Sequence, residues 1–360
     1  MSDDPVGRLA DGRAWDELCD RLKAAGHEIL GASSADPFER AEGLRYLTRL
    51  FRNFLKTSVE ESDPAAPVLS TENPKIGLDN PDYVYARARI SPAYEYRLSS
   101  RIGDAHLISF GAFSGGIGTP KGLIRDAYVT TDDLEIAPDG SFEIALSAAK
   151  KPGNWLGMGP DTNSLQIRQT LLERPRERPS PIELVRTDGG APPPPLDPAA
   201  FSRTLDRVGG TVAGTVSVFL GWTESFRSHL HRIRPIDPKL LAFAQGDPNT
   251  SYNYGYWELE EDQAFVVQFT PPDCEYWNLQ IGNHWLESLD FRHHRTHVNQ
   301  RTVAQEGDGS VRIVVAHRDP GVPNWLDTAG HARGALALRF VGAREVPEPR
   351  TSVVAVGDLS

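Results

Sequence analysis

The chain has 360 residues, enough for two domains with separate cores, because a single core seldom exceeds about 250–300 residues. A hydrophobic fraction of 39% and seven tryptophans indicate a folded protein and exclude a disordered one. The net charge of −11 disfavours nucleic acid and anionic membranes as partners.

The cysteines and the first residues bear on where the protein works. Cys19 and Cys274 are too few for a disulfide framework or a cysteine zinc site, so we expect reduced thiols. The chain starts without the basic residues and apolar run of a signal peptide, and it contains no stretch of about 18 apolar residues. These features predict a cytoplasmic protein without a membrane anchor.

Residues 1–60 form a predicted N-terminal helical segment. Apolar residues recur at helical spacing within 13–31. A second helix is expected to begin at Pro37, with Asp36 as its N-cap.

Residues 61–186 are predicted to form a first β region. From Tyr83 the hydrophobic period changes from about 3.6 to about 2, which is typical of strands. The glycine-rich run 111–118 has no nucleotide-binding spacing and is interpreted as a flexible loop. Strands are expected at 83–90, 107–110, 134–136 and 142–146.

The second half repeats this plan. Glycines and prolines at 187–199 predict a linker, and apolar residues at helical spacing predict a helical segment over 200–240. Residues 241–360 are then expected to form a second β region, which carries the site discussed below.

Three motifs show that the two β regions are related. Asp139-Gly140-Ser141 returns as Asp308-Gly309-Ser310, at an offset of 308 − 139 = 169. Asn-Trp-Leu at 154–156 returns at 324–326, and Arg168 returns as Arg339. The sequence therefore predicts an α+β, mainly β protein with two related antiparallel β-sandwich halves, jelly-roll-like and each preceded by helix.

Residues that both halves share are interpreted as architecture. Trp155 and Trp325 are expected to fill the core, and the asparagines before them to satisfy a turn. Arg168 and Arg339 are expected to hold matching strands.

Polar residues present in only one half are better candidates for chemistry. At the same offset His284 corresponds to Gly115, Asp290 to Lys121 and His317 to Ala148. Six of the ten histidines lie between residues 284 and 331, and imidazole is the acid or base that works nearest neutral pH. The predicted catalytic residues are His284, Asp290, His317, Asp319 and His331.

The chemistry of these side chains suggests a role for each in acid–base catalysis or substrate binding. His317 or His284 would be the general base, oriented by Asp319 or Asp290, and His331 would be a second acid or a substrate ligand. Hydrogen-bonding between the two sandwiches is the alternative role for the same residues. The predicted substrate-binding residues are Tyr254, Trp257, Trp285 and Arg318.

A metal site is a further alternative. His293, His294 and His297 offer imidazole ligands, but Arg292 and Arg295 beside them oppose a dication. Their spacing matches neither the zinc-protease nor the cupin pattern. We therefore predict no metal and no cofactor.

The residues around His284-Trp285, together with Asp308-Gly309-Ser310 and 317–326, resemble a bacterial family called domain of unknown function twelve-fourteen. The resemblance covers most of 250–345 and, more loosely, 80–170. It implies β-sandwich or jelly-roll folds and a suspected action on carbohydrates or other small organic molecules. It supplies no catalytic residues.

Two functions remain open. The first is a cofactor-independent hydrolase or lyase acting on a small polar or mixed-polarity organic molecule through His/Asp acid–base chemistry. The second is a non-catalytic small-molecule-binding or assembly protein. A small molecule is the expected partner in the first case, and a homo-oligomer is compatible with both.

Overall fold

The computed structural model describes residues 4–72, 74–189 and 195–359, and it divides into two compact units. The first unit comprises Met1–Pro74, Tyr83–Val218 and Ala242–Gln245. The second comprises Lys75–Asp82, Phe219–Leu241 and Gly246–Ser360. Each unit contains one β-sandwich. Part of the predicted linker, 190–194, lies outside the described residues.

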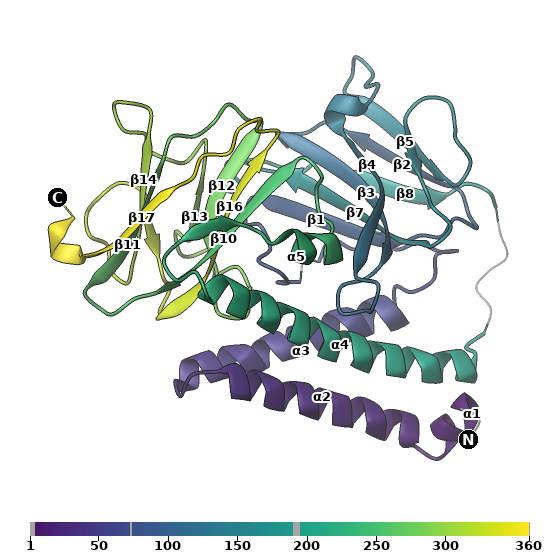
Figure 1. The fold of residues 1–360 in the computed structure, drawn as a ribbon. Helices are drawn as coiled ribbons and strands as arrows, with labels where there is room; N and C mark the ends of the chain where they lie inside the picture. The colour runs from purple at the N-terminus through teal and green to yellow at the C-terminus, as the bar shows by residue number, and fades with distance from the viewer. Residues whose placement is uncertain (1–3, 73, 190–194, 360) are drawn as a thin grey trace. The chain divides into compact units, whose positions relative to one another are not determined.

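The first sandwich has two four-stranded sheets, coloured blue to teal in Figure 1. One sheet has the order β1-β7-β3-β4 and the other β6-β5-β2-β8. All neighbouring strands run antiparallel except β5 and β6, which are parallel. The strands are β1 (Tyr83–Arg89), β2 (Tyr96–Arg101), β3 (Leu107–Gly115), β4 (Leu123–Thr130), β5 (Ser141–Ser147), β6 (Trp155–Gly157), β7 (Thr162–Thr170) and β8 (Ile182–Arg186).

The second sandwich repeats this topology strand for strand. Its sheets have the orders β13-β12-β16-β10-β9 and β15-β14-β11-β17, so only β9 is an addition. The parallel pair also returns, as β14 and β15. The strands are β9 (Ile233–Pro235), β10 (Thr250–Glu258), β11 (Gln263–Phe269), β12 (Tyr276–Ile281), β13 (His297–Asn299), β14 (Val311–Ala316), β15 (Trp325–Asp327), β16 (Arg333–Val341) and β17 (Arg350–Ala355).

Both sheets of each sandwich contribute side chains to one apolar core, because alternate residues of a strand point to the same face. In the first unit, Phe110 of β3 and Ile144 of β5 share a core. In the second, Trp257 of β10 and Ile313 of β14 do so. The predicted mainly β fold with two related sandwiches is confirmed.

Helices precede each sandwich in the chain, as predicted. Asp36 caps α3 by accepting a hydrogen bond from the Phe38 N–H over 3.0 Å. Within the described residues, no helix has the length and apolar character needed to cross a membrane. The helices are α1 (Pro5–Ala10), α2 (Arg13–Ala32), α3 (Pro37–Val59), α4 (Pro198–Arg227) and α5 (Pro238–Phe243).

The repeated Asn-Trp-Leu motif forms the same corner in both sandwiches. The Asn324 side chain donates to the carbonyls of Ala304 and Arg312 over 2.7 and 3.0 Å, and it accepts from the Ala304 N–H. The predicted turn-satisfying role of these asparagines is therefore confirmed. Asn154 makes the same three contacts with Glu135 and Glu143.

The tryptophans of this motif do not fill the core, contrary to the prediction. Trp155 and Trp325 are only half-buried, whereas Leu156 and Leu326 are buried in the cores. The reason is strand alternation, which turns neighbouring side chains to opposite faces. Trp325 packs on the outer face of its sheet, beside residues such as Val322.

Two local predictions in the first sandwich were wrong. Residues 134–136 form no strand, because the Glu135 backbone pairs with the Asn154 side chain instead of a neighbouring strand. The glycine-rich run was predicted as a loop, but Gly111 to Gly115 belong to the buried strand β3. Gly111 is needed there, because the Phe113 ring lies 2.5 Å from the position that a Cβ would occupy.

Candidate functional site

Two predicted histidines of the second sandwich meet at Thr328, in the turn after β15. The Nε2–H of His317 donates to the Leu259 carbonyl over 3.1 Å, and its Nδ1 accepts from the Thr328 hydroxyl over 2.9 Å. The Nδ1–H of His331 donates to the Thr328 carbonyl, also over 2.9 Å. Both ring nitrogens of His317 therefore engage neutral groups, and Asp319 does not orient it as predicted.

The residue before Thr328 forms a histidine–carboxylate dyad that was not predicted. Asp327 Oδ2 accepts the Nδ1–H of His294 over 2.6 Å, and Asp327 Oδ1 accepts the Ala329 N–H over 2.8 Å. The two side chains remain accessible, with 42% of His294 and 21% of Asp327 exposed. The carboxylate is thus fixed in place and holds an imidazole that solvent reaches.

A cation and a second carboxylate belong to the same group of loops. The Arg295 carbonyl accepts the Asp327 N–H over 2.8 Å, which ties the loop after β12 to β15. Partial burial lowers the pKa of the Arg295 guanidinium, and the charge of nearby Asp319 opposes that shift. We call His294, Arg295, His317, Asp319, Asp327, Thr328 and His331 the loop cluster.

Two other predicted residues make surface ion pairs instead. Asp290 Oδ1 lies 2.9 Å from Arg292 Nε, and the hydrogen bond from this guanidinium lowers the pKa of the Asp290 carboxyl. Arg318 contacts Glu261 over 3.0 Å, with both side chains largely exposed. Asp290 therefore does not orient His284, as the alternative pairing had predicted.

His284 lies in a buried aromatic environment of the second unit. Its Nδ1 is 2.6 Å from the Tyr256 hydroxyl, and its ring meets Trp285 edge to face. Tyr254 is buried against the rings of Phe226 and Trp222. Trp257 belongs to the apolar core, so packing accounts for its burial.

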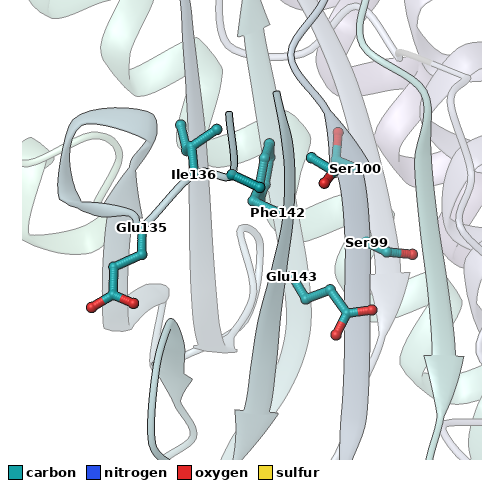
Figure 2. Close-up of a pocket in the computed structure, with 8 residues that line it drawn as sticks. Ser99, Ser100, Glu135, Ile136, Phe142 and Glu143 are labelled. Atoms are coloured by element: carbon teal, nitrogen blue, oxygen red, sulfur yellow. The ribbon is translucent and has the colours of Figure 1, made fainter. Parts of the chain in front are cut away.

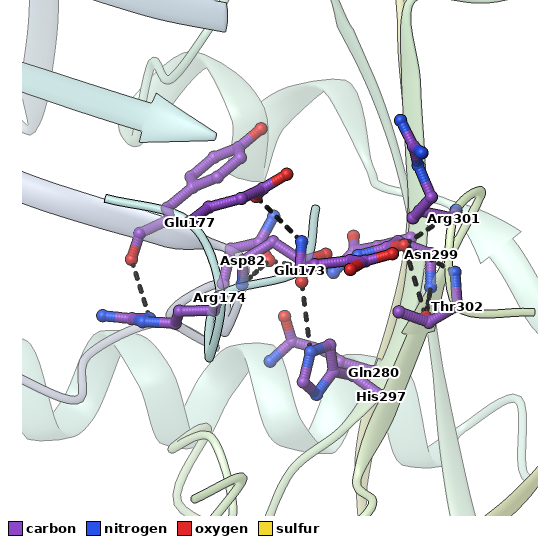
Figure 3. A network of polar contacts seen from close by, with 12 residues as sticks. Asp82, Glu173, Arg174, Glu177, Gln280, His297, Asn299, Arg301 and Thr302 are labelled. Atoms are coloured by element: carbon purple, nitrogen blue, oxygen red, sulfur yellow. Dashed lines mark hydrogen bonds and ion pairs between the residues drawn. The ribbon is translucent and has the colours of Figure 1, made fainter. Parts of the chain in front are cut away.

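Segment 75–82 makes a buried polar network with the sheet β13-β12-β16-β10-β9. Asp82 is 1% exposed and accepts from the Tyr276 hydroxyl over 2.7 Å and from the Nε2–H of His297 over 3.1 Å. Figure 3 shows the contact between Asp82 and His297. Asn80 extends the network, because it accepts from the Asn278 amide over 2.9 Å.

Arg339 anchors the same segment. Its guanidinium, in a residue only 5% exposed, donates to Gln280 Oε1 over 2.6 Å and to the Leu78 carbonyl over 2.5 Å. The Gln280 amide in turn donates to the Asp79 carbonyl over 2.9 Å. Arg339, which was predicted to hold a strand, therefore also binds segment 75–82.

Asp79 is a buried carboxyl of segment 75–82, and burial changes its pKa. Both of its oxygens accept from Ser288, one from the N–H and one from the hydroxyl, each over 2.9 Å. Burial raises the pKa of the Asp79 carboxyl, although the charges of Lys75 and Arg339 act in the opposite direction.

This shift predicts a pH dependence of stability. Because the pKa of Asp79 is raised above 3.8, the folded state keeps a proton that the unfolded state has lost, so stability falls as pH rises through that interval. In Asp79→Asn we expect a shallower fall. Urea unfolding between about pH 4 and about pH 8 measures both slopes, and equal slopes contradict the prediction.

Metal binding by the histidines at 293–297 has no geometric support. His294 and His297 bind different aspartates, Asp327 and Asp82. Across the described ranges, no three His, Cys, Asp or Glu side chains form a group that could hold a metal.

The first sandwich has an open depression of about 600 Å³ beside β2 and β5 (Figure 2). Glu135, Glu143, Ser99 and Ser100 are among its lining residues. None of the predicted site residues line it. Glu143 there lies 3.5 Å from Arg97, so its charge is partly compensated.

Asp327 was missed, although the repeat marks it. At the offset of 170 that relates the Asn-Trp-Leu motifs, Asp327 corresponds to Gly157, so it is a further polar residue of the second half alone. Asp82 was missed for another reason. It lies directly before strand β1, and 215 positions separate it from His297.

The fold and these loops define a class of protein built from two related β-sandwiches, the second of which carries the loop cluster. The chain belongs to the family described as protein of unknown function (DUF1214), whose model matches residues 256–345. The resemblance noted in the sequence is therefore confirmed.

Solved structures agree with this assignment. The chain is 42% identical to an uncharacterized protein from Burkholderia cenocepacia, with a TM-score of 0.94 and coverage of 98% of this chain and 100% of that one. The VPA0106 protein from Vibrio parahaemolyticus is 13% identical, with a TM-score of 0.50 and coverage of 93% and 100%, and it shares the fold alone. No curated protein matches the chain.

Proposed function

We propose that the protein is a cofactor-independent enzyme, a hydrolase or lyase, that acts on a small polar or mixed-polarity organic molecule. The observation that carries this proposal is the dyad His294–Asp327, in which a fixed carboxylate holds an accessible imidazole at 2.6 Å. Such pairs supply general acid–base catalysis near neutral pH.

The dyad has one defined chemical capacity. Asp327 accepts the Nδ1–H of His294, so the lone pair remains on Nε2 and this nitrogen accepts a proton. In a hydrolysis the proton would come from the attacking water, and in an elimination from a carbon of the substrate. Arg295 supplies a neighbouring cation that favours a substrate with a polar or anionic group.

A cytoplasmic location is part of the proposal. Cys19 and Cys274 are free thiols, and Cys19 is exposed. Free exposed thiols persist in reducing compartments.

The test is a substrate panel with matched variants. Wild type, His294→Gln and His293→Gln are assayed on p-nitrophenyl esters and glycosides, and on small 3-hydroxy acids whose elimination product absorbs in the ultraviolet. We expect turnover of at least one class, lowered about 10²–10⁴-fold in His294→Gln. His293 is exposed and lies next to His294, so its variant should keep the wild-type rate. Turnover that His294→Gln leaves unchanged, or no turnover of any class, overturns the proposal.

The non-catalytic alternative has one observation in its favour, the bonding of His317. Both of its ring nitrogens bind groups of the second sandwich, so this histidine braces the turn after β15. In His317→Ala we expect the free energy of unfolding to fall by about 1–3 kcal/mol. Urea denaturation checks this, and unchanged stability returns His317 to the list of catalytic candidates.

A further inference from the structure

One face of the sheet β1-β7-β3-β4 carries a group of arginines in the first unit. Arg87 and Arg89 lie two positions apart on β1 and therefore point to the same face. In the neighbouring strand β7, Gln166 pairs with Arg87 and Arg168 pairs with Tyr85. Arg168 is thus a diagonal neighbour of Arg87 on this face.

Among the residues that the structure describes, the guanidinium groups of Arg87 and Arg89 have no hydrogen-bond or ion-pair partner. Both side chains are half-buried, and neither makes a side-chain hydrogen bond or ion pair with any residue in 4–72, 74–189 or 195–359. A charge removed from water without a partner is costly, and proteins rarely keep one without a reason.

The surroundings are cationic. Burial lowers the pKa of Arg87 to about 10, and the positive charge of Arg168 contributes to the shift. Burial also lowers the pKa of Arg89, and Arg207 contributes there.

The acidic groups in reach do not neutralise these charges. Tyr85 and Glu61 favour the charged form of Arg87, but Tyr85 is a phenol and the Glu61 carboxylate lies 2.9 Å from the Lys56 ammonium. The face therefore keeps an excess of positive charge.

The internal repeat shows that these cations are specific to the first half. Arg168 of β7 corresponds to Arg339 of β16, and these two arginines pair with Tyr85 of β1 and Tyr252 of β10. Counted from these pairs along the strands, the positions of Arg87 and Arg89 are occupied by Tyr254 and Tyr256 in the second half. Arg339 is satisfied by oxygens of Leu78 and Gln280. A structural role common to both halves therefore does not explain why arginines occupy positions 87 and 89.

We infer that Arg87 and Arg89 form a binding site for the oxyanion of a small molecule, a carboxylate or a phosphate. Guanidinium groups bind such oxyanions through paired N–H donors, and partial burial strengthens the contacts. The inference is independent of the dyad in the second unit, and it does not require that the bound molecule be the substrate.

The test compares the full-length wild type with Arg87→Gln, Arg89→Gln and Arg97→Gln. Arg97 is half-exposed, contacts Glu143 on the other sheet of the same sandwich and serves as the control. Calorimetric titrations use inorganic phosphate in one arm and succinate in the other, at constant ionic strength. We expect binding in at least one arm, and a Kd about 10- to 100-fold higher in the Arg87 and Arg89 variants, as for loss of a charged hydrogen bond.

Thermal unfolding in anion-free buffer separates a binding role from a structural one. Because the Arg87 side chain has no partner in the described part of the chain, Arg87→Gln should keep or exceed the wild-type Tm there and lose the Tm increase that the bound anion causes. Binding in neither arm overturns the inference. An equal loss of affinity in Arg97→Gln also overturns it, as does a lower Tm of Arg87→Gln without anion.

Discussion

Replacing Arg339 by alanine should lower the free energy of unfolding of the second unit by about 3–5 kcal/mol. Its guanidinium is buried and donates to Gln280 Oε1 and the Leu78 carbonyl. Its charge also offsets part of the burial cost of Asp79. The variant would leave two buried acceptors without these donors and a buried carboxylate without this cation, and such losses are larger than the value of one hydrogen bond.

Urea denaturation followed by tryptophan fluorescence measures this loss, because five of the seven tryptophans belong to the second unit. Arg318→Ala is the control, since Arg318 and Glu261 form an exposed pair whose loss should cost less than about 1 kcal/mol. Combining Arg339→Met with Asp79→Asn should cost less than the sum of the single changes, because it removes both buried charges. A loss below about 1 kcal/mol in Arg339→Ala contradicts the assigned role.

The topology was predictable because its signals are local. Alternating apolar residues marked many of the strands, and the Asp-Gly-Ser turns marked where each half places the same bend. Gly140 and Gly309 both adopt positive φ, at 83° and 81°, as that turn requires. The failures are also local. Residues 134–136 have strand-like composition, but the Asn154 side chain, which lies 19 residues from Glu135, takes the Glu135 backbone groups.

The site was harder to predict because its contacts join distant parts of the chain. His294 and Asp327 are 33 positions apart, and no motif links them. Proximity in sequence suggested His317 with Asp319, but Asp319 accepts the Gly321 N–H, while His317 contacts Thr328 and Leu259. Asp319 is thus close to His317 in sequence, but its carboxylate is hydrogen-bonded within its own turn and does not contact the imidazole.

Comparing the two halves of the sequence pointed to the half that carries the candidate site but gave an incomplete role for Arg339. It directed attention to the second half, where the loop cluster lies, and it would have included Asp327 if applied to every polar residue. It also classed Arg339 as architecture because Arg168 matches it. The two arginines occupy equivalent strand positions. Arg339, however, donates to the Leu78 carbonyl of segment 75–82, whereas Arg168 donates to Gln166 on its own strand. Equivalent positions therefore have different partners.

Asp327→Asn should lower turnover of any substrate found in the panel about 10²–10⁴-fold while leaving the fold intact. The asparagine oxygen can still accept the Ala329 N–H, which places its NH₂ group against His294 Nδ1. An NH₂ group donates to Nδ1 and does not accept from it, so the imidazole proton moves to Nε2. The nitrogen that would receive the substrate proton then has no lone pair.

The measurement is kcat and kcat/KM of Asp327→Asn, with Asp290→Asn as the control. Asp290 is a half-exposed carboxylate that pairs with Arg292 at the start of the same loop, so its variant should retain the wild-type rate. The stability of Asp327→Asn should change by less than about 1 kcal/mol, because the dyad is accessible to solvent. His294→Gln combined with Asp327→Asn should be no slower than His294→Gln alone, because the two residues act as one unit. Additive losses in the double variant would show that Asp327 acts on the reaction by a route other than His294.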